Sequence, residues 1–135
     1  MRIVANRLQY LCMVRGLLLF CFYHNLSISG RDYLIELDGD LLSVYGPQSL
    51  RFLDRPWNRQ RAMKATMVQF NFVAFDDLVP YLARFRQTFP NVENFEFLET
   101  DIRSLNQLNA LSIVQGLTVL NIGTEGNPIA SKGQY

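Results

Sequence analysis

The stretch that decides the fold runs from Val92 to Leu108 and reads VENFEFLETDIRSLNQL. Its first half is apolar at Val92, Phe95 and Phe97, and the alternation over the last two has the period of two that is typical of a strand. In its second half Ser104 is followed three residues later by Gln107, which is the spacing of a capping box at the start of a helix. The stretch therefore predicts a strand, a turn and a helix in that order.

The same strand pattern recurs at a spacing of 25 residues on both sides. The three sets of apolar slots are Met67, Phe70 and Phe72, then Val92, Phe95 and Phe97, then Leu117, Leu120 and Ile122. Apolar residues at helical spacing fill the interval from Asp76 to Phe85, where Asp77 is the expected N-cap and Pro80 the third helical residue. Leu105, Leu108 and Leu111 share one side of the second helix, and Gly116 is its expected C-terminal cap. We expect three units, at 67–91, 92–116 and 117–135.

This period and pattern resemble the leucine-rich repeat, whose unit has about 20–29 residues and the consensus L-x-x-L-x-L-x-x-N-x-I-x-x-L-x-x-L. Thr100 stands where the family has Asn, and its hydroxyl can replace only part of that side chain. The third unit has Glu125 at this slot. Its 126–129 segment, GNPI, resembles the family's ending displaced by two residues, which predicts a lengthened turn after Ile122. The first unit has Phe75 there and is the weakest match.

The resemblance implies an α/β fold: a short leucine-rich-repeat solenoid with a parallel strand ladder on the concave face and helices on the convex face. It would occupy residues 31–135, after an atypical apolar N-terminal segment at 1–30. Residues 33–40 and 41–45 are expected strands, followed by a break at Gly46 and a short helix from Gln48 to Leu53. These elements are either a degenerate coil of the stack or a cap on it.

The apolar run from Leu8 to Tyr23 raises the question of a membrane anchor or signal peptide. Arg15 lies inside it, and its uninterrupted part is about eight residues long against the roughly twenty that a span needs, so a membrane span is not expected. No small-x-small cleavage site follows, which disfavours a signal peptide. At the other end, Leu117–Ile122 is an expected open edge strand, and we expect the chain to be part of a larger protein or poorly soluble alone.

Composition excludes several classes of function. A net charge of +1 disfavours a dedicated nucleic-acid binder. Cys12, Cys21 and His24 are too few for a zinc site or a disulfide scaffold. No phosphate loop or hydrolase motif is present, and the carboxylates of the 93–101 stretch are expected to face solvent rather than to catalyse. We therefore expect no enzymatic activity, cofactor or metal.

Binding of a protein partner is the expected function, because the strand residues between the apolar slots would line one polar face. The candidate contact residues are Gln69, Asn71, Asn94, Glu96, Val119 and Asn121. A second feature is the basic run Arg51, Arg55, Arg59, Arg61 and Lys64, which is either a solvated face or a contact for phosphates or an acidic partner tail. Two alternatives stay open: scaffolding for an array that binds elsewhere, or a small α/β domain with an unrecognised enzymatic or ligand site.

A closer resemblance, to a longer member of the family, is carried by four stretches: LRFLDRPWN at 50–58, FPNV at 89–92, LNQLNAL at 105–111 and EGNP at 125–128. It implies a cytoplasmic, cytoskeletal protein that is associated with microtubules and linked to a tubulin polyglutamylase complex. It would also make this chain a fragment.

Overall fold

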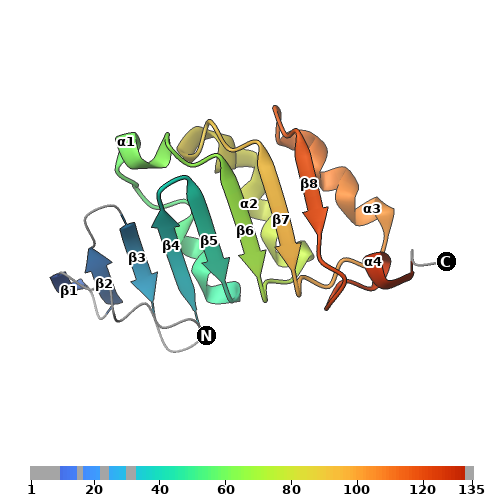
Figure 1. The fold of residues 1–135 in the computed structure, drawn as a ribbon, viewed down its shortest axis with the longest axis horizontal. Helices are drawn as coiled ribbons and strands as arrows, with labels where there is room; N and C mark the ends of the chain where they lie inside the picture. The colour runs from blue at the N-terminus through green and yellow to red at the C-terminus, as the bar shows by residue number, and fades with distance from the viewer. Residues whose placement is uncertain (1–9, 15–16, 22–24, 30–32, 133–135) are drawn as a thin grey trace.

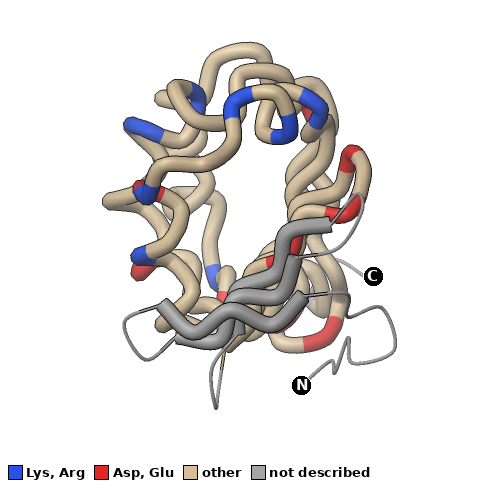
Figure 2. Tube along the Cα trace, turned by 90° about the vertical axis from the view of Figure 1, so that its left-hand side faces the viewer, with Lys and Arg blue, Asp and Glu red and all other residues tan. Residues whose placement is uncertain are grey.

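The computed structural model describes residues 10–14, 17–21, 25–29 and 33–132. Its strands form one eight-stranded sheet in which the order in space follows the order in the chain, from β1 to β8 (Figure 1). The helical connections after β5, β6 and β7 lie on one side of the sheet, which Figure 2 shows from its end. The chain is thus an α/β protein, as the repeat pattern predicted.

The sheet has an antiparallel half and a parallel half. The first five strands pair antiparallel; they are β1 (Tyr10–Val14), β2 (Leu17–Cys21), β3 (Asn25–Ser29), β4 (Leu34–Asp38) and β5 (Leu41–Tyr45). From β5 onward the pairing is parallel, through β6 (Met67–Asn71), β7 (Asn94–Leu98) and β8 (Val119–Ile122). Parallel neighbours need a crossover, and each pair here is joined by a helical connection. The parallel strands therefore lie adjacent in sequence order.

The antiparallel half includes the strands expected at 33–40 and 41–45, which are β4 and β5. Gly39, with φ +63°, makes the turn between them. Of the segment 1–30 the structure describes only β1, β2 and β3, which continue the sheet; residues 1–9, 15–16, 22–24 and 30 lie outside the described residues.

The register of the parallel strands corrects the first repeat. Val68 lies opposite Phe95, and Phe70 lies opposite Phe97, a spacing of 27 residues, whereas Phe95 and its partner in β8 are 25 apart. The uniform spacing of 25 was therefore wrong for β6: Val68 and Phe70 fill the slots assigned to Phe70 and Phe72, and Phe72 is 61% exposed. The repeat that begins with β6 is therefore two residues longer than the one that begins with β7. Both possible registers place apolar residues in the core slots, so the sequence pattern alone did not distinguish the two registers. The same shift means that Phe75 is not at the Asn slot.

The helix after β6, α2 (Phe75–Thr88), begins earlier than predicted. Its N-cap is Ala74 rather than Asp77, and Pro80 lies inside the helix instead of at its third residue. Phe75 explains the difference, because its ring packs edge-on against Phe97 at 5.4 Å and its N–H donates to the backbone oxygen of residue 100 at 2.8 Å. Burial of that ring extends the helix back to Phe75, and Pro80 is tolerated on the exposed side.

The connections on either side of α2 are shorter. After β5 come η2 (Pro47–Phe52), near the helix expected at 48–53, and α1 (Arg59–Ala62); after β7 come α3 (Leu105–Leu108) and η3 (Asn109–Ile113); α4 (Pro128–Lys132) follows β8. The predicted capping box is present, with Gln107 Oε1 accepting from the Ser104 N–H at 3.1 Å. Gly116 is left-handed, with φ +79°, but the C-cap of η3 is Val114, so the expected cap at Gly116 was wrong: this glycine lies in the turn beyond the helix. Leu105, expected on the inner side, is instead 72% exposed, and the packing is carried by Leu111.

The core lies between the sheet and α2 and is built from phenylalanine. Phe70 and Phe97 stack at 5.6 Å across neighbouring strands. Phe85 of α2 meets Phe95 edge-on at 5.3 Å, and Phe89 packs beside it at 5.2 Å. The strand rings of Phe70, Phe95 and Phe97 occupy slots where the repeat usually has leucine, so these slots hold the core with larger side chains.

The last strand is exposed. β8 ends the sheet order, and Val119 and Leu120 are 50% and 40% exposed. The predicted open edge strand is therefore the outer strand of the described sheet.

Candidate interaction surface

The sheet face opposite α2, called here the open face, carries the strand residues that alternate with the core. Pairing across the parallel strands aligns them in three rows: Leu41, Met67, Asn94 and Val119; Ser43, Gln69, Glu96 and Asn121; and Tyr45, Asn71 and Leu98. The middle row is polar throughout. The strand register thus places side chains from four different strands side by side.

Five of the six predicted contact residues are accessible on the open face. Gln69, Asn94 and Glu96 are half-buried, and Val119 and Asn121 are exposed. The register makes Gln69, Glu96 and Asn121 consecutive neighbours in one row.

Asn71, the sixth predicted residue, lies on the same face but is 5% exposed. Its Nδ2 donates to Gln69 Oε1 at 3.1 Å and to the Val44 oxygen at 3.4 Å. The amide is therefore occupied inside the protein and orients Gln69, so it contributes to the open face indirectly.

The open face is weakly acidic. None of the residues of β4 to β8 is Lys or Arg, and Glu96 lies in the middle row. Figure 2 shows acidic residues along the sheet side and most of the described basic residues on the side of the helices. The carboxylates of the 93–101 stretch do not form a site: Glu93 and Glu99 are exposed, and Asp101 accepts from Arg103 Nε at 2.9 Å. Within the described ranges no cluster of His, Cys, Asp and Glu has the makings of a metal site.

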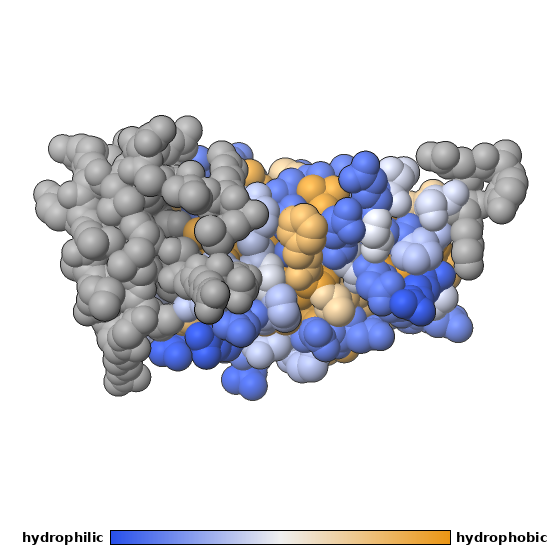
Figure 3. All heavy atoms as spheres, turned by 90° about the horizontal axis from the view of Figure 1, so that it is seen from below, coloured by the Kyte–Doolittle hydropathy of each residue, from blue (hydrophilic) through white to orange (hydrophobic). Residues whose placement is uncertain are grey.

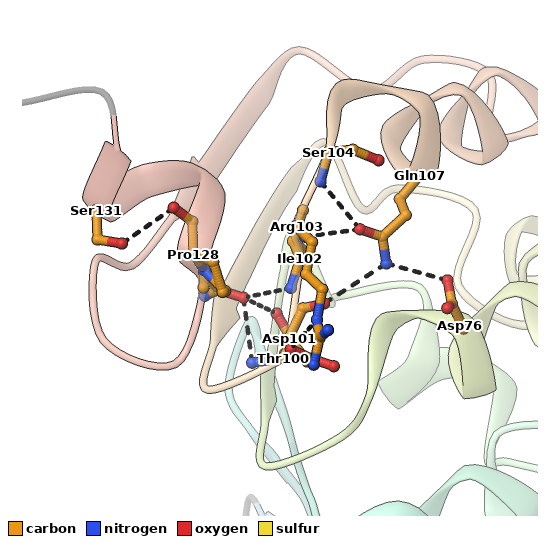
Figure 4. Close-up of polar contacts among 10 residues, drawn as sticks. Asp76, Thr100, Asp101, Ile102, Arg103, Ser104, Gln107, Pro128 and Ser131 are labelled. Carbon is orange, nitrogen blue, oxygen red and sulfur yellow. Dashed lines mark hydrogen bonds and ion pairs between the residues drawn. The ribbon is translucent and has the colours of Figure 1, made fainter.

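Asn127 occupies the bridging position that the repeat reserves for asparagine. It is 1% exposed, and its Oδ1 accepts from the Thr100 N–H at 3.2 Å, the Thr100 hydroxyl at 2.7 Å and the Ile102 N–H at 3.1 Å. Its Nδ2 donates to the backbone oxygens of Gly123 at 3.0 Å and Phe97 at 3.2 Å. Figure 4 shows Thr100 and Ile102 facing the turn that carries Pro128. The GNPI segment displaced by two residues therefore lies where the sequence predicted, and it joins two neighbouring turns of chain.

A left-handed backbone position follows each parallel strand. These positions are Gly46, Phe72, Glu99 and Gly126, with φ of 80°, 56°, 55° and 70°, and Asp101 after β7 is a further one, with φ 54°. Glycine adopts this conformation freely, whereas an L side chain is strained there. Phe72 is also largely exposed, at the edge where the parallel strands end, and Figure 3 shows apolar surface in the middle of that edge. The sequence pattern missed this position because φ leaves no periodic signal.

A shallow cavity of about 260 Å³ lies at the same edge, lined by Asp101, Thr124, Gly126 and Asn127 among others. It holds no nucleophile paired with a base, so its lining suggests no reaction. Every helix in the described part of the chain falls short of the length and apolar character that crossing a bilayer requires.

Comparison with known proteins gives two relatives. Human leucine-rich repeat-containing protein 49 is 41% identical over 99 residues, which is 73% of this chain and 14% of the relative. The mouse protein of the same name is 39% identical over 99 residues, with the same coverage. The chain thus spans only about 14% of the length of the curated relatives it matches. No family model matches the chain, and no solved structure matches it. On the match to these relatives, the chain belongs to the leucine-rich repeat family.

Proposed function

We propose that the chain is a short leucine-rich-repeat solenoid, with the open face as its concave side and the helices as its convex side, and that the open face binds a protein partner. The observation that carries this proposal is the middle row, in which Gln69, Glu96 and Asn121 are aligned by strand pairing on a face that α2 does not cover. Aligned accessible polar side chains suit recognition by hydrogen bonds.

The row also sets the size of what it contacts. Neighbouring strands lie about 4.8 Å apart and Ser43 is buried, so the three accessible residues of the middle row span roughly 10 Å. That length suits a short extended peptide or a loop of a folded partner. The carboxylate of Glu96 at its centre favours a partner that presents a donor or a positive charge there.

A pull-down with three substitutions tests the open face. Changing Gln69, Glu96 and Asn121 together to Lys places bulk and positive charge along the row, and we expect loss of partner capture relative to wild type. The matched control changes Asp77, Asn106 and Gln115 to Lys, three exposed residues outside the open face. Equal capture by the row variant and wild type would remove the open face as the binding surface. Circular dichroism of both variants checks that the fold is kept.

The identity of the partner is a finer proposal, supported by the resemblance of the 50–58, 89–92, 105–111 and 125–128 stretches. On that basis we place the protein in the cytoplasm, at microtubules, with a tubulin polyglutamylase complex as partner. Co-purification of polyglutamylase activity with the chain, lost in the row variant and kept in the control, is the expected result. If a partner is captured without polyglutamylase activity, this assignment is refuted, whereas the open face remains the proposed binding surface.

A further inference from the structure

Four of the five residues of the basic run lie at the edge where the parallel strands begin, away from the polar row of the open face. Arg55, Arg59, Arg61 and Lys64 form this basic cluster, and Asp54 is the single acidic residue between positions 51 and 64. Arg51 lies apart from it, in η2 at the other edge of the sheet, where its guanidinium packs over the Tyr33 and Phe52 rings. The cluster surrounds α1, and Figure 2 shows Lys and Arg residues crowded at the corresponding end of the tube. The fold therefore separates positive charge at this edge from negative charge on the open face.

A cavity of about 410 Å³ opens inside the basic cluster. Its lining combines charge with apolar surface and includes Arg55, Trp57, Arg59, Met63, Thr88 and Pro90. The residues come from the η2–α1 connection and from the end of α2, which are brought together only in the folded chain.

Trp57 is the aromatic residue of the cavity lining, and its position is fixed by contacts with neighbouring residues. Trp57 Nε1 donates to the backbone oxygen of Phe52 at 2.9 Å, and the indole meets the Phe89 ring edge-on at 5.4 Å. The Arg55 guanidinium carbon lies 5.4 Å from the centre of the Phe52 ring, in the range of a cation–π contact. A wall fixed in this way loses little conformational freedom when a ligand enters.

The arginines of the cavity keep their hydrogen-bonding capacity. Arg55 and Arg59 are exposed, and no carboxylate in the described part of the chain forms an ion pair with either. A guanidinium presents donors in a fork that matches a carboxylate, and flat apolar walls suit the methylene groups that precede it.

We propose that this cavity binds a carboxylate side chain of an acidic peptide segment in a partner protein. The cavity is local and partly open to solvent, and its lining holds two guanidinium groups, so it can receive a carboxylate side chain of a peptide that passes over it. A nucleic-acid footprint would need a basic stripe and an excess of positive charge, whereas the chain has a pI of about 7.8 and an acidic sheet face. The cavity and the open face are separate surfaces, so an experiment can refute one proposal without refuting the other.

Trp57 makes the proposal directly measurable, because it is the only tryptophan of the chain. Titration of the whole protein with an acetylated octaglutamate peptide should give a saturable change in its fluorescence that weakens as salt is added. The variant Arg55→Gln with Arg59→Gln should weaken binding by about tenfold or more, since each lost charged hydrogen bond is worth about that factor. The control, Arg84→Gln with Arg103→Gln, removes two charges that do not line the cavity and should bind within about twofold of wild type.

Three results would overturn the proposal. The first is no fluorescence change with octaglutamate at millimolar concentration. The second is an equal weakening of peptide binding in both double variants. The third is stronger binding of inorganic phosphate, duplex DNA or anionic lipid vesicles than of the peptide. The second would show a general charge effect, and the third would assign the cavity to another class of ligand. Circular dichroism of both double variants keeps loss of binding distinct from loss of fold.

Discussion

The Asn127 side chain offers the sharpest test of how the repeat turns are held together. In Asn127→Ala the N–H groups of Thr100 and Ile102 and the oxygen of Gly123 lose their hydrogen bonds to the Asn127 amide, while the Phe97 oxygen still accepts from the Gly123 N–H at 2.8 Å. A buried polar group left unpaired costs about 1–3 kcal/mol, so three of them cost about 3–5 kcal/mol with partial relaxation. That is a large share of the roughly 5–15 kcal/mol by which a domain is stable.

Equilibrium urea unfolding, followed by circular dichroism, measures this loss as a fall in the free energy of unfolding. Asn121→Ala is the matched control, because the same substitution at an exposed asparagine should stay within about 0.5 kcal/mol of wild type. Thr100→Val removes only the hydroxyl donor and should cost about 1 kcal/mol. If Asn127→Ala costs less than about 1 kcal/mol, or no more than Thr100→Val, the inferred bridging role is wrong.

Three further substitutions test the left-handed slot and the core by urea unfolding. Gly126→Ala should lower the free energy of unfolding by about 2 kcal/mol or more, since its Cβ would lie 2.5 Å from the Glu99 Cα at positive φ; an unchanged midpoint would contradict this. Phe72→Gly, at the equivalent slot, should raise the free energy of unfolding by about 0.5–1 kcal/mol, because relief of left-handed strain exceeds the added freedom of the unfolded chain, and a lower midpoint would refute the strain argument. Phe97→Ala should cost about 3–5 kcal/mol, and a loss below about 2 kcal/mol would mean that the aromatic stack is not the centre of the core.

The strands and their class followed from local patterns. Alternation of apolar residues predicted β6, β7 and β8, and the Ser104 and Gln107 pair predicted the start of α3, because these signals depend on neighbours within a few residues. The GNPI segment predicted the lengthened turn that carries Asn127. Each of these features depends on residues that lie close together in the sequence.

The register of the first repeat needed the tertiary structure. Phe70 and Phe72 both fit an alternating pattern, and only packing against Phe85 and Phe97 selects Phe70 as the buried one. A shift of two residues keeps the face of every side chain, so periodicity cannot detect it. The start of α2 was missed for the same reason, since burial of Phe75 outweighs the local preference for Asp77 as a cap.

The sequence by itself determined the repeat, the α/β class and the polar character of the strand positions between the core slots. The tertiary structure alone decided which of those positions are accessible, by burying Asn71 and leaving Gln69 beside Glu96. It also made Arg55 and Arg59 of the basic run part of a cavity wall, by bringing the end of α2 near Trp57. The physical reason is the same in both cases: periodicity reports on neighbours along the chain, whereas burial and cavities arise between residues that only packing brings together.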